Sequence, residues 1–253
     1  MVPVDDQIVP TGTGPRRRGL AGSQIAGLLV ASRPVASLLT ALALAGAALL
    51  AGRPLREAGL VGATMLVGQV ILAWDNDLVD RERDARHERA RKPLASGWVA
   101  PGNAWYAIVV AALLLVPLSI ANGLVAAGCY LASVLLGMVG NRGFRRSPLS
   151  FLPWAIVWGL YPYFIVAGGW GGTGVAALPD PTVVALFAGL GISLHVLRSL
   201  PGLVADREDG STSLPLMIAM RTGATPLLIV SVVTTLALVA AIIVVGQSSE
   251  LRA

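Results

Sequence analysis

Charged residues are scarce in this sequence of 253 residues. Asp, Glu, Lys and Arg make up only 13% of the chain, whereas roughly a quarter of a soluble globular chain is charged. Apolar residues make up 55%, and the mean hydropathy is +0.73. Because such a chain cannot cover itself with polar surface, the composition excludes a soluble enzyme and indicates an integral membrane protein.

Cysteine is nearly absent as well. Cys129 is the only one, and it lies within an apolar run. A single cysteine excludes a disulfide framework and a metal site built from cysteines.

Long apolar runs fill most of the chain after residue 22, and each is close to the ~20 residues that cross ~30 Å of hydrocarbon. None shows the alternation of a strand, and lipid admits only helices or closed barrels, so these runs are expected to be helices. The predicted fold class is an all-α membrane protein, a multi-span transmembrane helix bundle around a central cavity. Seven spans are expected, at about 35–52, 58–78, 101–120, 123–140, 151–169, 182–204 and 224–245.

The first 22 residues differ from the rest. They contain several Gly and Pro, Asp5, Asp6 and the run Arg16-Arg17-Arg18, without apolar periodicity. We expect residues 1–22 to be a disordered tail and residues 23–253 to form the transmembrane domain.

The basic residues predict the orientation. If the amino-terminal tail is cytoplasmic, only Arg53, Arg56 and Arg252 fall on the other side of the membrane. This asymmetry fits the positive-inside rule. We therefore expect a plasma-membrane protein whose N-terminus and acidic motifs face the cytoplasm. The net charge of +5 then reflects topology, and no nucleic-acid partner is expected.

Acidic residues gather at the end of the second expected span. On a helix, Asn76, Asp80 and Asp84 lie one turn apart on one face, with Asp77 one step round. Carboxylates ~6 Å apart repel by nearly 3 kcal/mol at an effective dielectric of ~20. The neighbouring arginines are expected to point elsewhere, so the pattern favours Mg²⁺, which carboxylates and a phosphate commonly share. A solvated anchoring loop is the alternative interpretation.

Basic residues follow this cluster, and a second acidic cluster lies at the end of the sixth expected span. Acid followed by base is the pattern of a site that holds metal and polyanion together. Because both clusters lie at cytoplasmic helix ends, we expect them to face one cavity. The second cluster comprises Asp206, Glu208 and Asp209, and the basic residues after the first are Arg86, Arg89, Arg91 and Lys92.

These motifs resemble the signatures of the UbiA superfamily of intramembrane prenyltransferases, over about Arg33 to Gly223. The specific part is Asn76-Asp77-x-x-Asp80-x-x-x-Asp84 followed by Arg91-Lys92-Pro93-Leu94-Ala95-Ser96-Gly97. Gln69-x-x-x-x-Trp74 is similar to a bacterial branch, and Asn141 to Arg146 resembles the basic loop after the fourth helix, with Gly140 and Arg145 at its usual tyrosine and lysine positions. Leu200 to Gly210 resembles the second aspartate-rich signature.

The resemblance implies Mg²⁺-dependent transfer of a prenyl group from an isoprenoid diphosphate to an aromatic or lipophilic acceptor. Metal ions and basic side chains would stabilise the departing diphosphate, and apolar helices would keep water from the carbocation. The candidate catalytic residues are Asp77, Asp80 and Asp206, and the candidate Mg²⁺ ligands are Asn76, Asp77, Asp80, Asp84, Asp206 and Asp209. The candidate diphosphate-binding residues are Arg86, Arg91, Lys92 and Arg145, and the candidate acceptor-pocket residues are Gln69 and His195.

Several further residues carry two interpretations. His195 lies about three turns before Asp206 on one helical face, so it either lines the acceptor pocket or bonds a neighbouring helix. Arg198 is expected to snorkel to the interface, and His87 to lie in a surface loop. The aromatic residues would stabilise a cation or form an interfacial belt; they are Trp154, Trp158, Tyr161 and Tyr163.

Two departures from the family keep other functions open. Gly202 stands where the second signature usually has an aspartate, and seven spans are expected where the family typically has about nine. A second chain could supply the missing wall of the cavity. The alternatives are a UbiA-type terpene cyclase acting on a prenyl diphosphate, and a non-catalytic lipid-binding or transporter-like relative.

Overall fold

The computed structural model describes residues 23–87, 92–169 and 178–247, and the described chain is a bundle of helices without strands. Residues 1–22, the expected tail, lie outside the described residues. The helices are α1 (Gln24–Ala31), α2 (Pro34–Leu50), α3 (Leu55–Val79), α4 (Arg81–Arg86), α5 (Pro101–Ala121), α6 (Leu124–Gly143), α7 (Leu152–Val166), α8 (Pro181–Ser199), α9 (Leu203–Glu208), α10 (Leu214–Thr222) and α11 (Ala224–Gln247). A short 3-10 turn, Leu200–Gly202, separates α8 from α9. The expected all-α class is confirmed.

Each of the seven expected spans overlaps one helix of at least 15 residues, but not all of these helices reach spanning length. Within the described residues, five helices are long and apolar enough to cross a membrane: α3, α5, α6, α8 continued through α9, and α11. The pair α1 and α2, bent by 50°, makes a sixth if it counts as one span. Helix α7 is apolar but has only 15 residues, short of the ~20 that a span needs.

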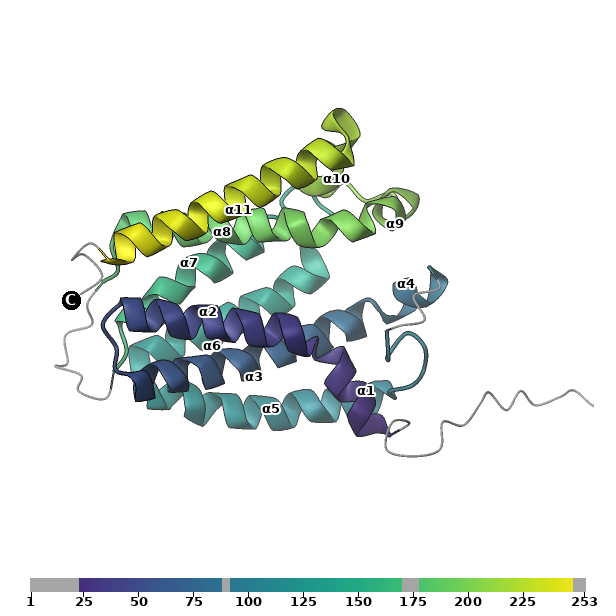
Figure 1. The fold of residues 1–253 in the computed structure, drawn as a ribbon. Helices are drawn as coiled ribbons and strands as arrows, with labels where there is room; N and C mark the ends of the chain where they lie inside the picture. Colours follow the sequence, from purple (N-terminus) through teal and green to yellow (C-terminus); the bar gives the residue numbers. More distant parts are fainter. Residues whose placement is uncertain (1–22, 88–91, 170–177, 248–253) are drawn as a thin grey trace, which may run out of the picture.

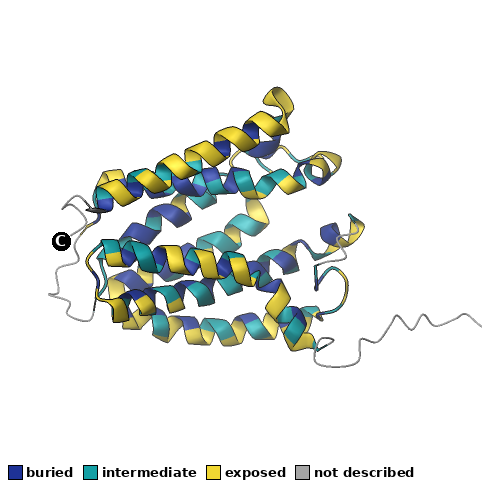
Figure 2. Cartoon of the chain, viewed as in Figure 1, coloured by how far each residue is buried: buried dark blue, intermediate teal, exposed yellow. Residues whose placement is uncertain are grey.

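The outer helices expose apolar side chains, as a lipid-facing surface requires. Figure 2 shows α11 and α5 largely exposed on their outer faces. Leu236 and Val244 of α11 and Leu113 of α5 are among these exposed side chains. No polar face accompanies them on α11, whose residues are almost all apolar.

The core is built where α3, α6 and α7 meet. Tyr130 of α6 stacks on Phe164 of α7 with ring centroids 4.7 Å apart, and its hydroxyl donates to the carbonyl of Met65, 3.2 Å away. Gly68 makes this contact close, because a Cβ there would collide with the Tyr130 hydroxyl. Small residues commonly permit such approach between membrane helices.

Successive long helices run up and down the bundle, so α4 and α9 emerge at the same end (Figure 1). The α5–α6 turn lies at the other end, where Gly123 adopts a φ of +110° that favours glycine. The two acidic clusters therefore lie at one end, as the sequence predicts. The bend between α1 and α2 lies at this end too, at Arg33, whose φ is +51°.

Candidate functional site

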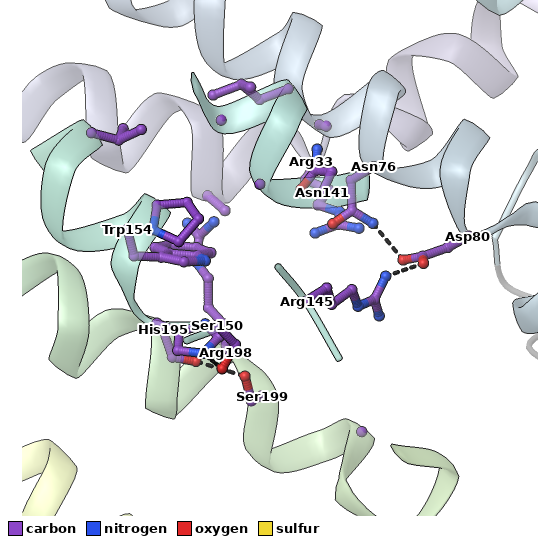
Figure 3. Close-up of a pocket in the computed structure, with 18 of the residues that line it drawn as sticks. Arg33, Asn76, Asp80, Asn141, Arg145, Ser150, Trp154, His195, Arg198 and Ser199 are labelled. Carbon is purple, nitrogen blue, oxygen red and sulfur yellow. Dashed lines mark hydrogen bonds and ion pairs between the residues drawn. The ribbon is translucent and has the colours of Figure 1, made fainter. Parts of the chain in front are cut away.

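A cavity of about 360 Å³ lies among α2, α3, α6, α7 and α8 at the end that carries α4 and α9. Its volume falls in the range of small-molecule sites. Polar residues from both signatures line it together with aromatic side chains. Figure 3 shows Asn76 and Asp80 of the first signature and the ring of Trp154. The polar and charged lining residues are Arg33, Ser37, Gln69, Asn76, Asp80, Lys92, Asn141, Arg145, Ser150, His195, Arg198, Ser199, Asp206 and Ser213.

The first signature reaches the cavity through Asn76 and Asp80. Helix α3 ends at Val79, and Asp80 caps it while beginning the turn into α4. The Asn76 amide nitrogen donates to Asp80 Oδ2 over 2.7 Å, and the other oxygen of Asp80 forms an ion pair with Arg145. The expected stacking of Asn76 and Asp80 on one face therefore holds, with a basic residue of the α6–α7 connection opposite them.

The other two carboxylates of the first signature do not line the cavity. Asp77 and Asp84 are almost fully buried, and Lys92 lies between them, with its Nζ 3.2 Å from Asp77 Oδ1 and 2.6 Å from Asp84 Oδ2. Arg33 also pairs with Asp77 over 2.8 Å. The neighbouring Arg83 does point elsewhere, as expected, toward the second signature. Lys92 and Arg33, which were not expected as partners, offset part of the repulsion within this cluster.

Asp75 forms a further pair that the sequence interpretation missed. Its carboxylate is completely buried, and Arg142 of α6 holds both oxygens, at 2.5 and 3.0 Å. Asn141 donates to the same carboxylate over 2.9 Å. The sequence could have indicated this pair, because an ionisable residue inside an apolar helix generally requires a charged or polar partner.

The second signature is held by Arg83 of α4. The Arg83 guanidinium forms ion pairs with Asp206 through Nη2 and with Asp209 through Nε. His87, expected in a surface loop, instead contacts Asp209 Oδ1 over 3.2 Å. Burial opposes the charge of Arg83, but its bonds to the two carboxylates outweigh burial and raise its pKa. Burial likewise opposes the charge of Asp209, and bonds to Arg83 and His87 outweigh it and lower its pKa.

Aromatic residues of α7 and polar residues of α8 form the other wall of the cavity (Figure 3). His195 Nε2 lies 3.0 Å from the hydroxyl of Ser150, so both interpretations of His195 apply: it lines the cavity and bonds a neighbouring segment. The Arg198 guanidinium lies over the Trp154 ring, 5.4 Å from its centroid. It faces the cavity, whereas snorkelling to the interface was expected.

The remaining predicted residues lie as follows. Gln69 lines the cavity and donates to the Tyr161 hydroxyl over 3.4 Å. Trp158 and Tyr161 line it too, whereas Tyr163 and the exposed Arg86 do not. Arg91 lies outside the described residues. Among the residues that the structure describes, no group of three or more His, Cys, Asp or Glu side chains is arranged to hold a metal ion unaided.

Comparison with solved structures identifies proteins of similar fold. Its fold is similar to that of a UbiA homolog from Archaeoglobus fulgidus bound to GPP and Mg²⁺, with a TM-score of 0.65, 17% identity, and coverage of 89% of this chain and 84% of that one. The same homolog bound to DMAPP and Mg²⁺ gives a TM-score of 0.62 at 16% identity, with coverage of 89% and 84%. No curated protein matches significantly.

A model of the UbiA prenyltransferase family matches residues 24–251. That match covers nearly the whole chain, and it agrees with the helical fold and the shared cavity of the two acidic signatures. The apolar helices and the family match together identify an integral membrane protein. The chain belongs to the UbiA prenyltransferase family.

Proposed function

We propose that this protein transfers a prenyl group from an isoprenoid diphosphate to an aromatic or lipophilic acceptor in the membrane, with Mg²⁺. The observation that carries the proposal is the cavity itself. Acidic and basic side chains line one part of it, and the aromatic rings of Trp154, Trp158 and Tyr161 line another. Its relative from Archaeoglobus fulgidus binds GPP, DMAPP and Mg²⁺, which supports a prenyl diphosphate as donor.

The donor atoms at the cavity fit a hard divalent cation. Asn76 and Asp80 present amide and carboxylate oxygens on its wall, and Mg²⁺ prefers oxygen ligands, usually one or two carboxylates plus substrate phosphates. The lack of an all-protein metal cage in the described chain agrees with that mode. When bound, Mg²⁺ supplies positive charge that stabilises the departing diphosphate.

Basic residues on the same wall are placed to bind the diphosphate. Lys92 and Arg145, both among the predicted diphosphate-binding residues, line the cavity, and Arg33 joins them. Each is held in position by a carboxylate of the first signature. Charge-assisted hydrogen bonds from these groups to phosphate oxygens would fix the donor and stabilise its leaving group.

The aromatic wall suits the prenyl cation and the acceptor. Ring faces attract cations, and apolar walls exclude the water that would quench a carbocation. Gln69 and His195 line this part of the cavity, so we assign them to the acceptor. We further propose that the protein lies in the plasma membrane with its N-terminus and both signatures in the cytoplasm, following the basic residues.

A terpene cyclase is the second candidate, because the same three rings would also stabilise the cations of a cyclisation. The experiment supplies purified protein and Mg²⁺ with labelled prenyl diphosphates of several lengths, with and without a lipid extract. A labelled product that needs the extract supports the transferase. A cyclic hydrocarbon made from the diphosphate alone supports the cyclase. Tight binding without turnover of any donor would refute both and support a non-catalytic relative.

A further inference from the structure

Arg83 joins the two acidic signatures by its side chain. It lies on α4, one turn after the first signature enters the cavity, and only 7% of its side chain is exposed. Its partners Asp206 and Asp209 lie more than 120 residues further along the chain. The guanidinium therefore bridges the two halves of the bundle at the end where the cavity lies.

The Arg83 guanidinium bridges two carboxylates, as a shared divalent ion would. One cation touches an oxygen of Asp206 and an oxygen of Asp209 at the same time. Arginine keeps its charge under all ordinary conditions, so its positive charge stays fixed between these carboxylates. A second ion at the same oxygens would have to displace a buried guanidinium or bind directly beside it.

The second signature also offers few other ligands. Gly202 lines the cavity four residues before Asp206, and it supplies no side-chain oxygen. The first signature differs, because the partner of Asp80 is Arg145, whose side chain is 33% exposed and has room to move. Both oxygens of Asp80 have protein partners as well. A metal ion at Asp80 would displace a partly exposed arginine, however, whereas one at Asp206 and Asp209 would have to displace the buried Arg83.

We infer that Arg83 takes the place of a second divalent ion, so that this protein binds a diphosphate with a single divalent ion, at Asn76 and Asp80. The inference rests on the proposed function, in that it assumes that the cavity takes a metal–diphosphate. Asp206 and Asp209 are then positioning residues, which hold Arg83 as a permanent positive charge at the cavity. The inference replaces the metal role that the sequence predicts for them.

The test counts metal ions rather than turnover. Purified protein is titrated with Mn²⁺ in the presence of inorganic pyrophosphate, and protein-bound Mn²⁺ is counted by equilibrium dialysis and by electron paramagnetic resonance, which detects coupling between neighbouring ions. The expected result for the wild type is one Mn²⁺ per chain, uncoupled. Two coupled ions would overturn the inference and leave the proposed function standing, whereas no bound ion would overturn both.

Two variants test whether Arg83 is the group that prevents binding of a second ion. The double variant Arg83→Met/Gly202→Asp removes the guanidinium and adds a carboxylate beside Asp206, and it should bind two coupled Mn²⁺ ions. Arg81→Met, on the same helix but outside the cavity, should keep one. A double variant that folds and still binds one ion would overturn the inference. If the double variant does not fold, the wild-type count decides alone.

Discussion

Arg142 Nη2 lies 2.5 Å from Asp75 Oδ1, and this carboxylate has no exposed surface at all. The pair joins α3 to α6 beside the cavity wall formed by Asn76 and Asn141. A buried carboxylate without its partner is strongly destabilising, whereas a neutral replacement of both members costs far less. The pair is therefore expected to hold the wall in place rather than to touch substrate.

Arg142→Met should accordingly lower the free energy of unfolding by about 1–3 kcal/mol, because the Arg142 side chain is 43% exposed and Asn141 still donates to the carboxylate. The double variant Asp75→Asn/Arg142→Met should recover most of that loss, because no uncompensated charge remains buried. Unfolding in mild detergent measures both. Equal destabilisation of the single and double variants would show that the effect is packing and not charge.

Arg33 should show a backbone effect separate from its ion pair. Its φ of +51° is left-handed, which costs a residue other than glycine about 1–2 kcal/mol. Arg33→Ala and Arg33→Gly both lose the contact with Asp77, but only glycine relieves the backbone. Arg33→Gly should therefore be more stable than Arg33→Ala by roughly 1 kcal/mol, measured by the same unfolding assay. The reverse order would contradict the backbone strain.

The orientation can be tested by cysteine labelling in intact cells. In a background with Cys129→Ser, cysteines at the exposed positions Ala85 and Glu208 should resist a membrane-impermeant reagent until the cells are opened. A cysteine at Leu55, exposed at the opposite end of the bundle, should react from outside. Labelling of position 85 or 208 in intact cells would refute the cytoplasmic placement of the signatures.

The positions of the helices could be predicted from the sequence, because the apolar runs determine the spans. The shared end of both signatures could be predicted too, because they follow the second and the sixth span, and an even number of spans returns the chain to the same side. The basic partners of the acidic residues in α3 and in the second signature could not be predicted. Arg33, Arg142 and Arg83 lie 44 to 126 residues from the acids they contact, and helix spacing does not determine which side chains of separate helices meet. The bend at Arg33 and the shortness of α7 could not be predicted either, because tertiary packing overrides local helix propensity.

Gly202→Asp should lower the Mg²⁺ requirement of the reaction in the Arg83→Met background, where no guanidinium occupies Asp206 and Asp209. The backbone of Gly202 has a φ of −104°, which any residue adopts, and the position lines the cavity near Asp206. A further carboxylate there should strengthen ion binding by about 1–2 kcal/mol, or about 5- to 30-fold in half-saturating Mg²⁺. A Mg²⁺ titration of Arg83→Met and of Arg83→Met/Gly202→Asp measures the shift. An unshifted midpoint, with reduced activity or expression, would mean that Gly202 is needed for space.

The most direct test of the central claim is the Mg²⁺-dependent release of diphosphate from a prenyl diphosphate by Asp80→Ala and by its control, Glu82→Ala. Asp80 lines the cavity with Asn76, whereas Glu82 is exposed on α4, away from it. Size-exclusion chromatography shows whether both variants remain folded. We predict that folded Asp80→Ala loses at least about 100-fold in rate, the scale of losing one group that stabilises developing charge, and that Glu82→Ala keeps the wild-type rate. Activity of Asp80→Ala within a few-fold of the wild type would contradict the assignment of this cavity as a metal–diphosphate site.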